Sequence, residues 1–162
     1  MINKKMKLFS TSVVIVLVVI LISVALDPLS TVKASDAGNG YIESPQGTFF
    51  DLEKAILSAE SGNVLHVYGG IYNSSITIAK PLTLIGHDWP TVDGGNEGTV
   101  VKVTAPDVLI TGFKITNSGK NLDKENSGIA VEAPKVTIKH NLFEDTLFGI
   151  YLRNASNSII SH

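Results

Sequence analysis

The chain has 162 residues, a formal net charge of −2 and no cysteine. The lack of cysteine excludes a disulfide framework, a thiolate metal site and a lipid-anchored cysteine. After the first 34 residues, nine basic residues stand against fourteen acidic ones. Because phosphate recognition needs clustered lysine and arginine, this balance argues against a nucleic-acid partner.

The N-terminal segment, residues 1–34, has the layout of a secretory signal peptide. It begins with a cluster of lysines, and residues 13–26 are almost continuously apolar. Small or modest side chains precede the expected cleavage after residue 34. An uncleaved membrane anchor is the alternative, because residues 8–26 are long enough to cross a bilayer. Either topology places the following domain in the periplasm or outside the cell.

Residues 35–47 are polar and rich in glycine, which predicts a linker or a strand that leads into the domain. Thr48 and Asp51 then have the spacing of a capping box. Apolar residues follow at helical intervals, which predicts one amphipathic helix over residues 49–60. The rest of the domain, which we place over residues 48–162, alternates with a period of two in short segments typical of strands.

Short tracts in the strand-rich part recur at regular intervals, which is typical of a repeat protein. The matching tracts are residues 105–110 with 133–138, residues 128–131 with 149–152, residues 138–140 with 160–162, and residues 84–86 with 110–112. The shorter shifts give a basic unit of 21 to 22 residues. Inserted loops at residues 87–98 and 118–127 account for the longer shifts.

A unit of this length cannot bury its apolar side chains alone, so successive units must stack. Stacking places equivalent residues in inward ladders, namely Val103, Val131 and Leu152, then Val108 and Val136, then Ile110, Ile138 and Ile160. The pattern predicts an all-β fold, a right-handed parallel β-helix with an N-terminal capping α-helix. The last repeat breaks off at residues 158–162, so we expect the β-helix to be incomplete at its C-terminal end.

Several tracts, in this order along the chain, resemble the NosD family of periplasmic β-helix accessory proteins. They are residues 81–86, 92–95, 107–113, 117–119, 128–129 and 147–152. Each tract alone is common among carbohydrate-binding and sugar-hydrolase (CASH) β-helices. The resemblance implies an exported, non-enzymatic scaffold that assists copper-centre maturation of nitrous oxide reductase. It also implies partners, namely an ABC-type ATPase and permease complex and a copper chaperone or the reductase.

The four histidines are the candidate copper ligands, since the chain has no cysteine and both methionines lie in the N-terminal segment. His140 and His162 occupy equivalent positions in adjacent coils, where two imidazoles could share a copper or zinc ion. The alternative is that both are residues of a repeated corner. His87, expected in a polar loop, is a third candidate, and His66 is expected to be a surface residue of a strand. We expect no catalytic or cofactor-binding residues.

The alternative function is that of an extracellular carbohydrate-binding or polysaccharide-degrading β-helix. Hydrolysis needs two carboxyl groups roughly 5 to 10 Å apart around the scissile bond. The densest acidic cluster comprises Asp88, Asp93 and Glu97, and it lies beside the single tryptophan, Trp89. These residues also fit a turn and loop packing. Glu144 and Asp145 are expected on a corner without a basic partner, and Arg153 is the only arginine, so a lyase site is poorly supplied.

Overall fold

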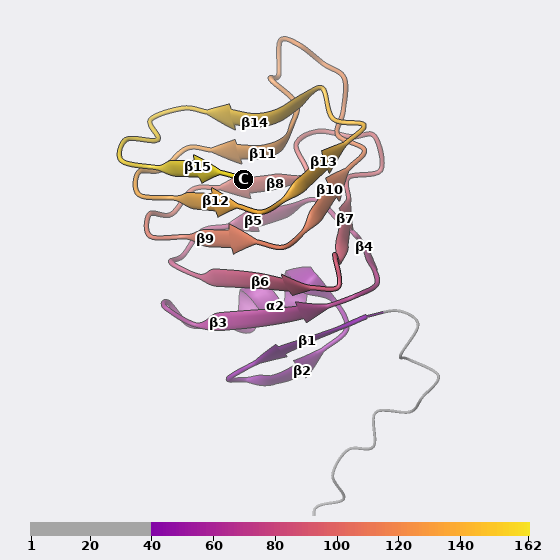
Figure 1. The fold of residues 1–162 in the computed structure, drawn as a ribbon, viewed down its shortest axis with the longest axis vertical. Coiled ribbons are helices and arrows are strands. Elements are labelled where there is room, and N and C mark those ends of the chain that lie inside the picture. The colour runs from indigo at the N-terminus through magenta and orange to yellow at the C-terminus, as the bar shows by residue number, and fades with distance from the viewer. Residues whose placement is uncertain (1–39) are drawn as a thin grey trace, which may run out of the picture. The chain divides into compact units, whose positions relative to one another are not determined.

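The computed structural model describes residues 40–162, and the predicted signal peptide or anchor, residues 1–34, lies outside the described residues. Figure 1 shows the chain winding upward through stacked coils. The strands nearest the viewer run to the right and those behind run to the left, so the solenoid is right-handed. Within residues 40–162 no helix has the length and apolarity needed to span a bilayer. The predicted parallel β-helix is confirmed.

Three sheets form the walls of the solenoid, and each coil contributes one strand to each sheet (Figure 1). Sheet A contains β1 (Tyr41–Ser44), β2 (Gly47–Phe49), β3 (Val64–Tyr68), β6 (Thr83–His87), β9 (Leu109–Thr111), β12 (Thr137–Lys139) and β15 (Ile159–Ser161). Sheet B contains β4 (Ile71–Asn73), β7 (Thr91–Asp93), β10 (Lys114–Thr116) and β13 (Leu142–Glu144). Sheet C contains β5 (Ile76–Ile78), β8 (Val101–Val103), β11 (Ser127–Val131) and β14 (Phe148–Leu152). From β3 onward, neighbouring strands pair in parallel.

The core consists of inward ladders in which equivalent residues of successive coils lie beside one another. Sheet A supplies Leu65, Leu84, Ile110, Ile138 and Ile160. Sheet B supplies Tyr72, Val92, Ile115 and Phe143, and sheet C supplies the ladder of Ile78, Val103, Val131 and Leu152. Val108 and Val136 of the other predicted ladder are also buried. The ladders predicted from the repeats are therefore confirmed, with Leu152 and Ile160 of the last described coil still 50% and 44% exposed. Since alternate residues of a strand point to opposite faces, the outer faces carry the remaining side chains.

The coils differ in length mainly at the corner between sheets B and C. Residues 94–100 and 117–126 form the two long corners, and the second rises above the last coil in Figure 1. The insert predicted over residues 87–98 is wrong in part, because Thr91–Asp93 forms β7. Val92 in this strand is 1% exposed and joins the sheet B ladder, so burial of one side chain places the segment in the wall.

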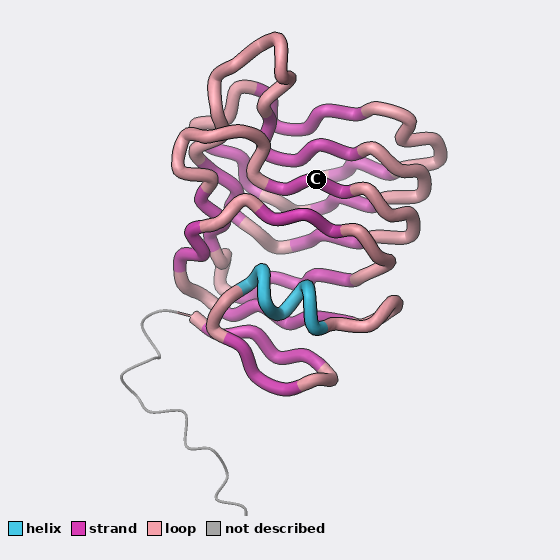
Figure 2. The backbone as a smooth tube through the Cα atoms, turned by 180° about the vertical axis from the view of Figure 1, so that it is seen from behind, coloured by secondary structure: helices cyan, strands magenta, loops and turns pink. Residues whose placement is uncertain are grey.

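The N-terminal end is covered by a hairpin and a short helix. Strands β1 and β2 pair antiparallel, and β1 also pairs antiparallel with β3, which covers the otherwise free edge of the first coil. Helix α2 (Leu52–Ser58) buries Leu52, Ala55 and Ile56 and contacts β1, β2 and β5. Figure 2 shows α2 on the face opposite to that of Figure 1. The helix caps the core as predicted, and the hairpin was not predicted.

The predicted bounds and N-cap of this helix are wrong. The helix does not start at residue 49, because Thr48 belongs to β2 and pairs with Glu43. Asp51 is the N-cap instead, and its side chain accepts a hydrogen bond of 3.0 Å from the N–H of Lys54. At the other end, Nζ of Lys80 donates to the backbone oxygens of Leu57 and Ala59, which ties the helix to the first coil.

Consecutive coils approach each other closely where the chain leaves sheet A. A Cβ atom on Gly86 would lie 2.4 Å from the carbonyl oxygen of Gly112, and a Cβ atom on Gly112 would lie 2.4 Å from that of Gly86. Gly112 also has a φ of 83°, which favours glycine. The glycine that recurs in residues 84–86 and 110–112 is therefore required by the contact between coils.

A buried corner is closed by the side-chain amide of Asn141. Its Oδ1 atom accepts a hydrogen bond of 3.0 Å from the N–H of Phe113 in the preceding coil. Its Nδ2 atom donates to the backbone oxygens of Ile110 and Lys139, each at 3.0 Å. In the described part of the chain every buried side-chain nitrogen and oxygen has such a partner, as expected for a well-ordered core.

Candidate functional site

The outer face of sheet A carries a stack of aromatic rings at its N-terminal end. The rings of Tyr41 and Tyr68 lie 4.6 Å apart between centroids, and those of Tyr68 and His87 lie 4.5 Å apart, each pair inclined by 13°. The register explains the stack, because Tyr68 is directly opposite Tyr41 on one side and His87 on the other. Three strands thus hold three half-buried rings in one row.

His66 lies beside this stack and contacts His87. The Nδ1 atom of His66 lies 2.9 Å from the Nε2 atom of His87, so the two imidazoles share one proton in a hydrogen bond. Their ring centroids are 5.2 Å apart. Both side chains are half-buried on the outer face of two adjacent parallel strands, β3 and β6. The structure therefore brings together two nitrogen donors on a rigid sheet.

Glu43 supplies a negative charge at the same place. It is directly opposite His66 in the antiparallel pair of β1 and β3, and its Oε2 atom accepts a hydrogen bond of 3.2 Å from the hydroxyl of Tyr68. Partial removal from water and the neighbouring Glu43 carboxylate both raise the pKa of Tyr68. Glu43 and His66 also line one shallow surface pocket of about 300 Å³. We call Tyr41, Glu43, His66, Tyr68 and His87 the histidine–tyrosine cluster.

The predicted pair of His140 and His162 does lie in adjacent coils. The ring centroids are 6.5 Å apart and the ring planes are inclined by 57°, and both side chains are exposed. His140 follows β12 at a corner and has a φ of 49°, as the alternative of a repeated corner expects, and a metal ion shared by this pair stays a prediction. His87 ends strand β6 and does not lie in a loop, which corrects our expectation for that residue.

The contact between His66 and His87 was missed in the sequence. The two residues are 21 positions apart, but the register of β3 with β6 has a shift of 19, so His66 is directly opposite Ile85 and His87 is opposite Tyr68. The two histidines therefore meet diagonally across the sheet, whereas His140 and His162 were paired as equivalent positions of adjacent coils. The residues following β6 also look like a polar loop, so His87 was not assigned to a strand.

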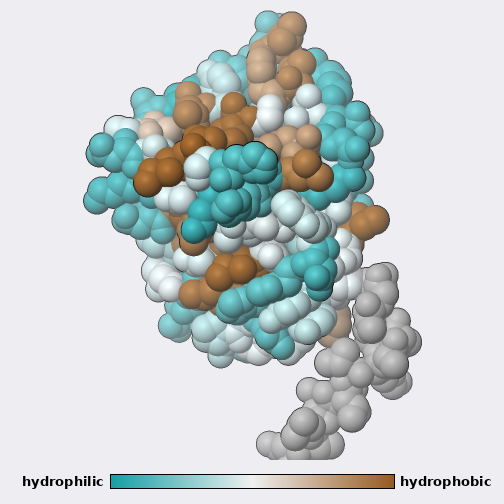
Figure 3. Space-filling model, in the orientation of Figure 1, coloured by the Kyte–Doolittle hydropathy of each residue, from teal (hydrophilic) through white to brown (hydrophobic). Residues whose placement is uncertain are grey.

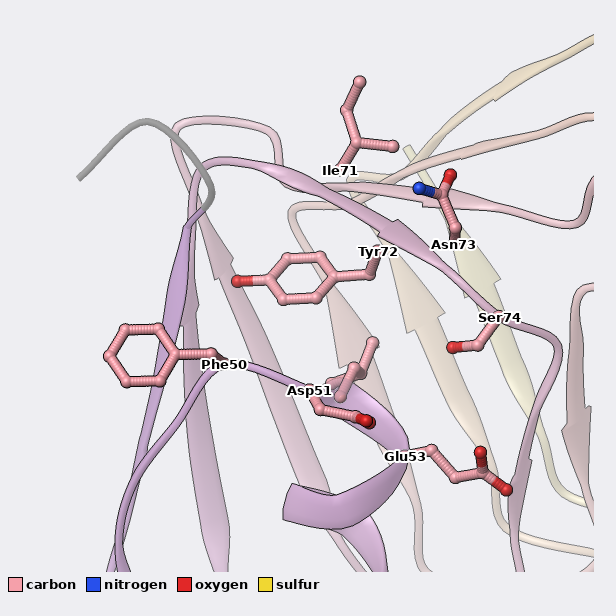
Figure 4. Close-up of a pocket in the computed structure, with 8 residues that line it drawn as sticks. Phe50, Asp51, Glu53, Ile71, Tyr72, Asn73 and Ser74 are labelled. Atoms are coloured by element: carbon pink, nitrogen blue, oxygen red, sulfur yellow. The ribbon is translucent and has the colours of Figure 1, made fainter. Parts of the chain in front are cut away.

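A second candidate is a pocket of about 290 Å³ between the start of α2 and strand β4 (Figure 4). Two carboxylates, those of Asp51 and Glu53, border it together with Asn73 and Ser74, and the half-exposed ring of Phe50 stands at its rim. Two carboxylates with an aromatic ring are the features expected of a sugar site. This pocket was not predicted, because the sequence suggested that Asp51 serves only as part of a helix start.

The chemistry of this pocket favours binding over hydrolysis. The hydrogen bond from the N–H of Lys54 lowers the pKa of Asp51, and an ion pair with the Lys54 ammonium group has the same direction. A general acid for glycoside hydrolysis needs a raised pKa so that it carries a proton. Asp51 is therefore an ionised acceptor that caps the helix and can accept hydrogen bonds from a ligand.

The acidic cluster expected around the tryptophan has other partners. Asp93 accepts hydrogen bonds from the N–H of Gly95 and from the side-chain amide of Asn117, so its carboxylate holds a corner. Trp89 is 55% exposed and has a φ of 55°, on a turn after β6. Glu97 is exposed in the long corner before β8. The cluster borders none of the pockets described above.

Contacts between coils correct our expectation that Glu144 and Asp145 have no basic residue nearby. Glu144 does have a basic partner, because it pairs with Lys114 of the preceding coil across sheet B. The oxygen that Asp145 offers to Lys120 is its backbone carbonyl. Arg153 pairs with Glu125 of the long corner. These contacts join residues 25 to 30 positions apart, so they become visible only when the coils stack.

The outer face of sheet A is mixed in polarity. In the view of Figure 3, apolar patches alternate with hydrophilic side chains over sheet A. The outward residues there include Ile85, Leu109 and Thr137, which lie in successive strands β6, β9 and β12. A rigid face of this kind, several strands wide, is suited to contact with another macromolecule.

Comparison with known proteins gives one distant relative. No family model matches the chain, and no solved structure matches it. The chain is similar to the "Probable ABC transporter binding protein NosD" of Pseudomonas aeruginosa, with 28% identity over 98 residues. The alignment covers 59% of this chain and 23% of the relative, so the chain spans less than a quarter of that protein's length.

Proposed function

We propose that this protein is a non-catalytic accessory protein of the NosD type, exported to the periplasm or cell surface. In this role it binds an ABC-type permease and ATPase complex and assists copper-centre maturation of nitrous oxide reductase, together with a copper chaperone or the reductase. The similarity over 98 residues to a relative named for ABC transporter binding is the observation that carries the proposal.

The architecture supports a binding role. Parallel stacking holds the strands of sheet A in register, and neighbouring coils are joined by backbone hydrogen bonds and by ion pairs such as those of Lys102 with Glu132 and Lys114 with Glu144. Such a face presents its side chains in fixed rows, so little conformational entropy of the backbone is lost when a partner binds. The outward side chains of sheet A include the histidine–tyrosine cluster and the apolar patches.

Deletion of the gene in its own organism, followed by measurement of copper in purified nitrous oxide reductase, tests the maturation role. We expect reductase with a depleted copper content, restored by the wild-type gene. Fully copper-loaded reductase in the deletion strain would refute the maturation role.

Crosslinking of the tagged protein on intact cells tests the partner. We expect the ABC-type permease among the products, and we expect Ile85→Glu on the outer face of sheet A to weaken this crosslink. Thr77→Glu is the matched control, because Thr77 is an exposed residue of β5 in sheet C. Equal crosslinking by wild type and Ile85→Glu would remove sheet A as the contact face.

The second candidate function is carbohydrate binding at the pocket of Figure 4. It is favoured by the two carboxylates and the half-exposed Phe50 at one opening, because polar groups orient a sugar and an aromatic ring packs on its apolar face. Calorimetric titration with cell-wall oligosaccharides tests it, with Phe50→Ala and Asn73→Ala as variants. Saturable binding that both variants weaken would support this candidate, and no heat of binding for any oligosaccharide would dismiss it.

A further inference from the structure

We propose that His66 and His87 form a binding site for one divalent transition-metal ion that prefers imidazole ligands, such as Cu²⁺ or Zn²⁺. The site lies on the outer face of sheet A, where it joins strand β3 of the first coil to strand β6 of the second. It goes beyond the proposed accessory function and does not rest on it.

The separation of the two nitrogen atoms fits a shared ion. Imidazole nitrogens bind zinc and related ions at about 2.0 Å, so two ligands at a right angle around the ion are about 2.8 Å apart. The Nδ1 atom of His66 and the Nε2 atom of His87 are 2.9 Å apart. The separation therefore already matches that of two ligands of a tetragonal ion, and a tetrahedral ion needs a separation of about 3.3 Å.

Neighbouring side chains hold the ligands in place before an ion binds. The ring of His87 packs against Tyr68 at 4.5 Å, and Tyr68 is fixed in turn by Tyr41 and by its hydrogen bond to Glu43. Because these contacts restrict the rotation of the His87 ring, ion binding has a smaller ordering cost. A fixed outer shell of this kind is what orients histidine ligands in metal sites.

The charge and exposure of the site also suit a cation. Glu43 is opposite His66 and lines the same surface pocket, so the cluster contributes a negative charge near the site and no cation, although this carboxylate is not itself a ligand. No three histidine, aspartate or glutamate side chains of residues 40–162 are close enough together to hold an ion. Water must therefore complete the coordination, and the half-buried position of both imidazoles leaves it room.

Protons remain balanced when the ion enters. In the ion-free protein one imidazole donates its N–H to the other. On binding, this hydrogen bond is lost, and the proton moves to the other nitrogen of the donor ring. No proton is then gained or lost, and each imidazole offers one lone pair to the ion.

The test uses the full chain with His140→Gln and His162→Gln, which leaves His66 and His87 as the only histidines. We expect this background variant to bind one Cu²⁺ in calorimetric titration and to show nitrogen coupling from two imidazoles in its electron paramagnetic resonance spectrum. Zn²⁺ should bind at the same stoichiometry and raise the melting temperature. Addition of His66→Gln should weaken binding of both ions by at least about 10-fold, since loss of an outer-shell partner alone has effects of this size.

Two results would overturn the inference. One is the absence of Cu²⁺ binding, or of two-nitrogen coupling, in the background variant. The other is unchanged affinity after His66→Gln. Circular dichroism of each ion-free variant shows whether it is folded. Should His66→Gln fail to fold, His87→Tyr, which keeps a ring on Tyr68, takes its place with the same expected loss.

Discussion

Replacement of Gly86 by alanine tests the close contact between consecutive coils. The new Cβ atom would lie 2.4 Å from the carbonyl oxygen of Gly112 and 2.8 Å from its carbonyl carbon. Cβ atoms in proteins essentially never lie closer than 3.0 Å to another heavy atom, so the backbone at Gly86 or Gly112 must move by at least 0.6 Å. The N–H of Gly112 is bonded to the carbonyl of His140 in the following coil, so the movement extends through three coils.

The expected loss of stability follows from this geometry. Overpacking of a well-packed region costs typically about 1 to 3 kcal/mol. Because both atoms in the way belong to the backbone rather than to a flexible side chain, we expect Gly86→Ala to lower the free energy of unfolding by about 3 kcal/mol. The loss should appear as a lower urea midpoint, with an unchanged slope of the unfolding free energy against urea concentration.

Gly149→Ala is the matched control. Gly149 also lies in a strand, β14, but the nearest atom to its new Cβ is Cγ of Phe143 at 3.6 Å, an ordinary contact. Neither glycine has a φ in the left-handed region. We expect the control to be neutral or more stable by up to about 1 kcal/mol, because alanine restricts the unfolded chain. A wild-type urea midpoint for Gly86→Ala, or an equal loss in both variants, would refute the reasoning.

Three further outcomes are expected. Burial raises the pKa of Tyr72 to about 12. The neutral phenol therefore contributes to stability in full below about pH 10, and this contribution is lost as the pH rises through 12. In urea titrations at different pH values, Tyr72→Phe should reduce this alkaline loss of stability, and an unchanged pH profile would show that Tyr72 does not cause it. Asn141→Ala should lower the free energy of unfolding by about 2 kcal/mol, because it leaves the buried N–H of Phe113 without a partner; a loss below about 0.5 kcal/mol would show that water replaces the amide. Ile138→Asp should unfold the coil by burying an unpaired charge at a side chain that is 1% exposed, whereas the exposed His140→Ala should change little, and equal losses in thermal melts would count against the assigned ladder.

Local pattern was sufficient for the coil architecture. Ile110 and Ile138 lie at equivalent places in repeated tracts, and the structure pairs them side by side. This worked because a parallel stack places like residues over one another, so the period of the sequence is also the spacing of neighbours in space. The capping helix was found for a similar reason, since its apolar face has its own period of 3.6 residues.

Contacts that cross coils at unequal spacings could not be read in the same way. Lys114 pairs with Glu144 across 30 positions and Lys120 with the backbone of Asp145 across 25, because the corners differ in length. The start of α2 was misplaced because Thr48 carries a capping pattern but is held in a strand by Glu43. The strand pairing across the hairpin outweighs the weak local preference of Thr48 for the start of a helix.

The sequence by itself determined that the chain forms a right-handed parallel coil with these inward ladders, since burial of periodic apolar residues allows few other arrangements. Only the tertiary structure decided which polar side chains meet on the outside. His66 and His87 come within 2.9 Å because the register of β3 with β6 sets them on one face, next to a ring stack that begins in the hairpin. That register depends on corner lengths and strand ends, which no single local pattern specifies.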